Sequence, residues 1–235
     1  IPGHDPTGPP QGCAARPFSI ARSRILIVLS VIIAMVFAMT FLNMPLLGAG
    51  WFWDLGNALG LLAYAGLLFQ MIPGRPKGRL VKRHEWLGYA TLALGGVHAF
   101  WFLLGDGAVH VYLQPGAPAY MWLGLAALIL LGVLTVLARM PERMRVHSTY
   151  RVFKQVHRWL GVGLVVAAAL HIALSGFYLS VWWQVLLLAV ATGAACFGRP
   201  LWTRLKTPPS ASGRLYLMAG SAAVLVFVLI RDLTP

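Results

Sequence analysis

Seven stretches of mostly apolar residues follow one another along this chain, each close in length to a membrane-crossing helix. An α-helix needs about 20 such residues to cross the hydrocarbon core of a bilayer. Polar or turn-rich breaks separate the stretches, which comprise residues 25–44, 51–72, 86–104, 120–137, 159–179, 181–197 and 215–230. The pattern predicts an all-α membrane protein, a polytopic bundle of about seven transmembrane helices.

Charged residues are few, and their positions predict an orientation. Only 11% of the 235 residues are charged, against about 25% in a typical soluble domain. Lys and Arg fall before the first stretch, between the second and third, after the fourth and after the sixth, whereas the other connections contain none until Arg231. By the positive-inside rule, the amino terminus is predicted to be cytoplasmic in a multi-pass protein of the cell inner membrane. The net charge of +13 is therefore attributed to topology, not to nucleic-acid binding.

One short motif occurs twice and places a pair of histidines on each of two helices. His84 and His157 each begin the motif His-Xaa-Trp-Leu-Gly, and a second histidine follows in each copy, at His98 and at His171. The spacing of 14 residues in both copies corresponds to about 21 Å of helical rise and to nearly the same helix face. The third and fifth helices run in the same direction, so side-by-side packing is expected to bring His84 level with His157 and His98 level with His171.

Four histidines at matched positions predict two pairs of metal ligands. Ionisable groups inside a bilayer are costly unless something compensates them. Imidazole is a good ligand for haem iron. We therefore predict two b-type haems, one above the other, between His84 and His157 (the inner pair) and between His98 and His171 (the outer pair). A single histidine would be explained by a hydrogen bond to a neighbouring helix, but the equal spacing favours haem.

Residues beside the inner pair are predicted to fit the macrocycle. Gly88 and Gly161 follow the inner histidines by one helical turn and would leave room for a flat ring. Arg83 and Arg158 are expected to pair with the propionates of the inner haem, as are Lys82 and Lys154.

The connection beside the outer pair contains no Lys or Arg, so the outer propionates are expected to rely on water or on polar residues there: His110, Tyr112 and Gln114. His147 lies in the basic connection after the fourth stretch and, like His110, is interpreted as a solvated residue. Asp54 and Asn57 open the second stretch and are interpreted as interfacial capping residues.

The histidine pairs resemble those of the ferric-reductase-like transmembrane domain family, which includes ferric reductases, NADPH oxidases and the haem-binding subunit of bacterial methionine sulfoxide reductase. The resemblance covers residues 51–197. In that family, such pairs on the third and fifth helices hold stacked haems that carry electrons across the bilayer. The sulfoxide reductase subunit generally lacks the early third-helix histidine that His84 supplies. The resemblance thus implies a dihaem electron-transfer component of an oxidoreductase.

The redox partners are expected to be separate molecules. Family members with their own electron source continue into a cytoplasmic flavin and NADPH domain, whereas here only residues 199–214 separate the sixth stretch from the seventh. No G-x-G-x-x-G fingerprint follows a predicted strand. A flavoprotein, an iron–sulfur protein or a membrane quinol is the expected donor, and ferric iron, oxygen or a periplasmic protein the expected acceptor.

Other functions stay open. The chain could be a quinone-linked, haem b-bearing membrane anchor of a larger complex, or a non-redox membrane scaffold or transporter with metal-binding histidines. The cytochrome b of quinol:cytochrome c oxidoreductases also pairs histidines in this way, but its Pro-Glu-Trp-Tyr motif is absent here. The predicted organisation is a flexible cytoplasmic tail at 1–24, a six-helix haem-binding transmembrane domain at 25–198, and a cytoplasmic loop with the seventh helix at 199–235.

Overall fold

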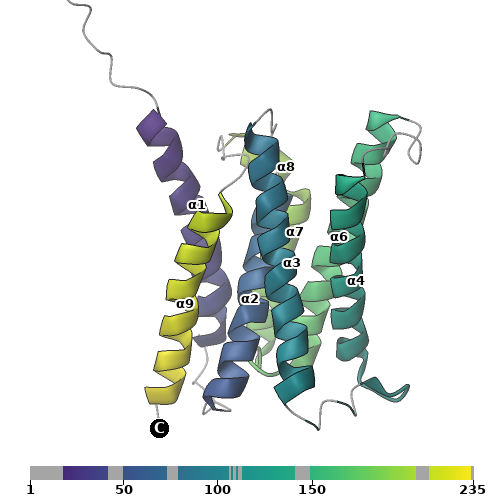
Figure 1. The fold of residues 1–235 in the computed structure, drawn as a ribbon. Helices are drawn as coiled ribbons and strands as arrows, with labels where there is room; N and C mark the ends of the chain where they lie inside the picture. Colours follow the sequence, from purple (N-terminus) through teal and green to yellow (C-terminus); the bar gives the residue numbers. More distant parts are fainter. Residues whose placement is uncertain are drawn as a thin grey trace, which may run out of the picture.

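The computed structural model is all-helical over the residues it describes, which are 18–41, 50–72, 79–105, 107, 110, 113–140, 149–204 and 212–233. Eight α-helices and one 3-10 helix lie within these ranges, with no strand, and they stand side by side in a bundle (Figure 1). The elements are α1 (Phe18–Ala38), η1 (Met39–Phe41), α2 (Trp51–Met71), α3 (Arg79–Gly105), α4 (Ala119–Arg139), α6 (Tyr150–Ser175), α7 (Trp182–Phe197), α8 (Arg199–Arg204) and α9 (Gly213–Leu233). The predicted fold class is confirmed.

Seven of these helices correspond to the seven apolar stretches. By length and composition, α2, α3, α4, α6 and α9 can each cross a membrane, and α1 and α7 contribute the shorter apolar segments Leu26–Ala38 and Trp182–Phe197. The apolar part of α2 is 67% buried, whereas that of α3, α4, α6 or α9 is at most 22% buried. The chain is thus a multi-pass membrane protein in which α2 is central and the other long helices turn apolar faces outward, toward lipid.

The helices that carry the histidines extend beyond the apolar stretches that predicted them. The starts of α3 at Arg79 and of α6 at Tyr150 precede the predicted starts at 86 and 159, so both inner histidines lie within helices. The hydroxyl of Thr149 caps α6 by accepting a hydrogen bond from the N–H of Val152 at 3.3 Å. Gly176 ends α6 early by adopting a φ of 68°. Hydropathy marks the lipid-embedded part of a helix, while its caps set its ends.

The direction of the helices separates the charges in space. In Figure 1, α3 and α6 run the same way, α1 begins at the end where they begin, and α9 finishes at the opposite end. The helix ends nearest the start of α3 carry most of the described basic residues: Lys82, Arg83, Arg139, Arg151, Lys154, Arg158, Arg199, Arg204 and Arg214. Which end faces the cytoplasm stays a prediction, as do the domain boundaries; residues 1–17 of the predicted tail lie outside the described part.

The two histidine-bearing helices do not pack directly against each other. The main partner of α3 is α2, and the main partner of α6 is α4. The expectation of side-by-side packing is therefore corrected: the imidazoles of the two helices meet across a space, at two levels. On its other two sides this space is bounded by α2 and α4, each of which packs closely against one of the two histidine-bearing helices.

Hydrogen bonds between helices fix α7 and α9 on the central helix. The buried hydroxyl of Tyr216 in α9 donates to the carbonyl of Leu62 in α2. The hydroxyl of Tyr64 in α2 lies 2.6 Å from Oγ1 of Thr192 in α7. Bonds of this kind between membrane helices contribute about 0.6 kcal/mol each on average, so together they specify the packing more than they stabilise it.

The closest approach of α9 to α2 predicts a sensitive glycine. A Cβ at Gly66 would lie 2.6 Å from the Tyr216 hydroxyl and 2.8 Å from Oγ1 of Thr91, and both oxygens are fixed by hydrogen bonds to carbonyls. We expect Gly66→Ala to lower the free energy of unfolding in detergent by about 1–3 kcal/mol through overpacking. Gly163→Ala is the matched control because nothing lies within 4 Å of its added Cβ. Equal unfolding free energies for the two variants would contradict this packing.

Candidate functional site

The structure brings the four histidines of the repeat together in two facing pairs. His84 of α3 faces His157 of α6, with ring centroids 6.3 Å apart and ring planes at 65°. His98 faces His171 in the same way, with centroids 6.2 Å apart and planes at 73°. Each pair takes one ring from each of the two helices, and the four rings lie at two levels of the bundle.

The separation within each pair fits two ligands on opposite sides of one metal ion. An imidazole nitrogen lies about 1.1 Å from its ring centroid and a metal–imidazole bond is about 2.0–2.1 Å long. Two imidazoles bound on either side of one ion would therefore have centroids about 6.3 Å apart. No group of three or more His, Cys, Asp or Glu gathers anywhere in the described ranges. Pairs suit haem, because the porphyrin supplies the four remaining nitrogens.

Backbone carbonyl groups orient both outer histidines. Nδ1 of His98 lies 2.8 Å from the carbonyl oxygen of Gly56 in α2, and Nδ1 of His171 lies 2.7 Å from that of Tyr120 in α4. Since a carbonyl oxygen can only accept, Nδ1 must carry the proton in both rings. Nε2 then keeps its lone pair. Metal-binding histidines typically make this second hydrogen bond, which fixes the tautomer and the ring orientation.

Two glycines that the sequence reasoning missed make room for these rings. A Cβ at Gly60 would lie 2.8 Å from Nδ1 of His98, and a Cβ at Gly124 would lie 2.8 Å from Nδ1 of His171. Each glycine follows by four residues the one whose carbonyl accepts the hydrogen bond, so the two halves of the site are built alike. The G-x-x-x-G spacing of Gly56 and Gly60, typical of close helix contacts, was an available signal.

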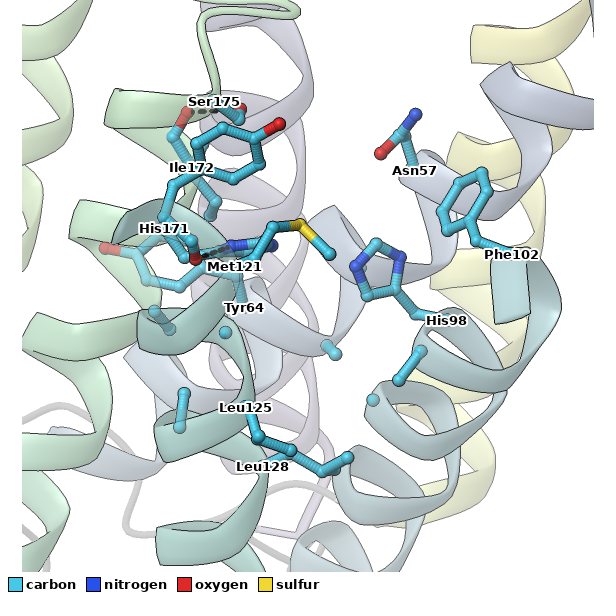
Figure 2. A pocket seen from close by; sticks show the side chains of 18 of the residues that line it. Asn57, Tyr64, His98, Phe102, Met121, Leu125, Leu128, His171, Ile172 and Ser175 are labelled. Atoms are coloured by element: carbon cyan, nitrogen blue, oxygen red, sulfur yellow. Dashed lines mark hydrogen bonds between the residues drawn. The ribbon is translucent and has the colours of Figure 1, made fainter. Parts of the chain in front are cut away.

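A cavity of about 340 Å³ surrounds the outer pair, between α2, α3, α4 and α6. Figure 2 shows the rings of His98 and His171 on opposite walls, with Met121 reaching into the space between them. Most of the lining is apolar, from Leu, Ala, Phe and Gly residues of the four helices. The volume falls within the range of about 300–1,000 Å³ found for sites of small ligands and cofactors.

The inner pair has different surroundings. Nδ1 of His157 is buried without a hydrogen-bond partner among the described residues. Gly88 and Gly161, predicted to leave room for a macrocycle, adjoin the last turn of α2: added Cβ atoms would lie 3.6 Å from Oε1 of Gln70 and 3.4 Å from Sδ of Met71. Those are ordinary contacts, so these two glycines are less constrained than Gly60 and Gly124.

The remaining predicted site residues are less closely placed. Arg83 is half-buried and Arg158 is exposed, each next to an inner histidine in the sequence. His110 and Gln114 are exposed beyond the end of α3. Tyr112 and His147 lie outside the described residues.

Asp54 is a buried side chain, and its interpretation as a capping residue is wrong. The carboxylate is 1% exposed and accepts a 2.8 Å hydrogen bond from the hydroxyl of Tyr178, which lines the outer cavity. No side chain caps the amino end of α2. Asn57 forms a hydrogen bond within α2, where its Nδ2 donates to the carbonyl of Trp53 at 2.9 Å.

Arg231 contributes a buried cation to the same region, although the sequence placed it in the far connection. It is 4% exposed, and its guanidinium carbon lies 4.5 Å from the ring centroid of Tyr178. Its Nη2 also donates a hydrogen bond to the carbonyl of Thr40 at 3.3 Å. Charged residues from opposite ends of the chain, Asp54 and Arg231, are therefore buried on either side of one tyrosine. No local pattern in the sequence signals this arrangement.

Comparison with protein families gives one match. The family described as "Ferric reductase like transmembrane component" matches residues 38–168, which is 131 of the 235 residues. The matched segment contains His84, His98 and His157 and ends three residues before His171. No curated protein and no solved structure matches the chain significantly.

The buried contact between Asp54 and Tyr178 predicts a specific stability loss. Tyr178→Phe removes the donor and leaves a buried carboxylate oxygen unsatisfied, which costs about 1–3 kcal/mol. We expect the variant to unfold at a lower temperature in detergent. In an Asp54→Leu background the same change should cost much less, because no acceptor remains to be orphaned. An equal cost in both backgrounds would show that the hydroxyl acts elsewhere.

Proposed function

This chain belongs to the ferric reductase-like transmembrane component family, and we propose that it carries electrons across the membrane through two stacked b-type haems. The inner haem lies between His84 and His157, and the outer haem between His98 and His171. The observation that carries the proposal is the spacing of the two facing pairs, 6.3 and 6.2 Å between ring centroids. That spacing fits bis-histidine ligation at both levels.

Bound haem supplies the one-electron chemistry of iron. The residues of the chain determine how that chemistry is used. His98 and His171 would offer Nε2 lone pairs to the iron, because Nδ1 of each ring donates its proton to a carbonyl group. Haem held by two histidines would leave the iron without a free place for a substrate. This ligand set favours passing electrons on over activating a bound molecule.

The electron donor and acceptor are separate molecules in this proposal. The protein lies in the inner membrane of the cell, and the end of the bundle with most of the described basic residues faces the cytoplasm. At that end a flavoprotein, an iron–sulfur protein or quinol donates electrons. Arg83 and Arg158 pair with the propionates of the inner haem. Ferric iron, oxygen or a periplasmic protein accepts electrons at the other end, where Asp54, Tyr178 and Arg231 lie beside the outer cavity.

Haem content provides the first test of the proposal. A pyridine haemochrome assay on the purified protein should give two b haems per chain. His98→Ala and His157→Ala should each lose one haem, because each removes one ligand of a different pair. Ser221→Ala is the control and should keep both, since this exposed residue lies on α9, a helix without histidines. A colourless parent protein would eliminate the proposal and leave a scaffold or a metal-binding transporter.

Electron transfer across a sealed membrane provides the second test. Vesicles containing the purified protein are loaded with ferricyanide, and a membrane-impermeant reductant is added outside. We expect the entrapped ferricyanide to be reduced at a rate proportional to the protein content. His98→Ala should slow this reduction at least tenfold, because the outer haem is then missing from the path. Equal rates in parent, variant and protein-free vesicles would contradict transmembrane conduction.

A further inference from the structure

The outer and inner histidine pairs differ in their hydrogen bonds. Both outer rings donate from Nδ1 to a backbone carbonyl, at 2.8 Å for His98 and 2.7 Å for His171. Within the described part of the chain, Nδ1 of His157 in the inner pair is buried without a hydrogen-bond partner, and His84 makes no side-chain hydrogen bond. The two inner rings face each other with centroids 6.3 Å apart. Both pairs thus consist of two histidines, but only the outer histidines are oriented by hydrogen bonds to backbone carbonyl groups.

The neighbouring carboxylate does not compensate for this difference. Glu85 follows His84 directly, but its Oε1 accepts hydrogen bonds from the hydroxyl of Tyr89 at 2.9 Å and from the guanidinium of Arg139. The side chain is therefore engaged on the α4 side of the helix. Glu85 therefore does not give the inner histidines the kind of hydrogen bond that the outer histidines have.

A hydrogen bond from Nδ1 to a carbonyl changes the electronic character of a ligand histidine. The carbonyl oxygen draws the Nδ1 proton toward itself, so electron density on the ring rises and Nε2 becomes a stronger donor to the metal. A stronger donor stabilises ferric iron more than ferrous iron, because the ferric ion carries the larger positive charge. The reduction potential of that haem is lowered as a result.

Charges on the protein act in the same direction. Lys82, Arg83, Lys154 and Arg158 all lie within three residues of an inner histidine. Cations near a haem favour the ferrous state and raise its potential. Beside the outer cavity the buried charges, Asp54 and Arg231, are of opposite sign and offset each other.

We infer that the carbonyl groups of Gly56 and Tyr120 set the outer haem at a lower reduction potential than the inner haem, with Gly60 and Gly124 acting as positioning residues for the two hydrogen bonds. This inference rests on the proposed function. A protein with one electron therefore keeps it mainly on the inner haem. The outer haem becomes reduced second and is the stronger reductant toward an acceptor.

Potentiometric titration of the haem absorption bands tests the order of the potentials. The parent protein should show two one-electron components. His84→Ala removes an inner ligand, so the haem that remains should match the lower component. His98→Ala should retain the higher component. If the haem retained by His84→Ala titrates with the higher component, the inference is overturned.

The two glycines test the cause. In Gly60→Ala or Gly124→Ala the added Cβ, 2.8 Å from Nδ1, pushes the ring off its carbonyl. We expect the lower component to rise by about 59 mV, a tenfold change in the ratio of reduced to oxidised haem at a fixed potential. The higher component should stay unchanged. Gly132→Ala in α4 and Gly163→Ala in α6 are matched controls, because nothing lies within 4 Å of their added Cβ atoms.

The outcomes separate the two levels of argument. Haem that is present but unmoved in both glycine variants, or a shift of both components together, would overturn the role of the carbonyls while leaving electron transfer intact. If the glycine variants bind no haem, the titrations of His84→Ala and His98→Ala still decide the order. A parent protein without haem would instead refute the proposed function itself.

Discussion

The space between α3 and α6 is the constraint on which the rest of this bundle depends. Two helices that carry histidines must stay far enough apart for two facing rings at each level, about 6.2–6.3 Å between centroids. Neither helix can then draw its support from the other. That support comes from α2, which packs against α3, and from α4, which packs against α6. Both supporting helices also line the cavity around the outer pair, so the four helices together hold the two histidine-bearing helices at a fixed separation.

Backbone carbonyl groups orient the outer rings without adding polar side chains to an apolar cavity. A carbonyl oxygen in a helix has two lone pairs and uses one for its intrahelical bond, so the second can accept from a histidine. Gly60 and Gly124 let the rings come close enough to reach those oxygens. In a bilayer, where an unsatisfied polar atom is costly, this arrangement satisfies Nδ1 with atoms that are already present.

The last helix, α9, contacts the rest of the bundle near both of its ends, although it lies outside the segment that matches the family. Near its start Tyr216 donates to the carbonyl of Leu62 in α2. Near its end Arg231 lies over the ring of Tyr178, whose hydroxyl donates to Asp54. A buried cation and a buried anion thus connect α9 to the wall of the outer cavity.

The sequence by itself determined the helical membrane fold, the number and order of the apolar helices, and the histidines that face each other, because hydropathy and a fixed helical repeat are local properties. The tertiary structure decided what lies around those histidines. The carbonyl of Tyr120 has no side-chain signature, the clash at Gly60 depends on where His98 lies, and Asp54 and Arg231 reach the same tyrosine only after folding. Contacts of this kind join residues far apart in the chain, so no periodicity or spacing along one segment could specify them.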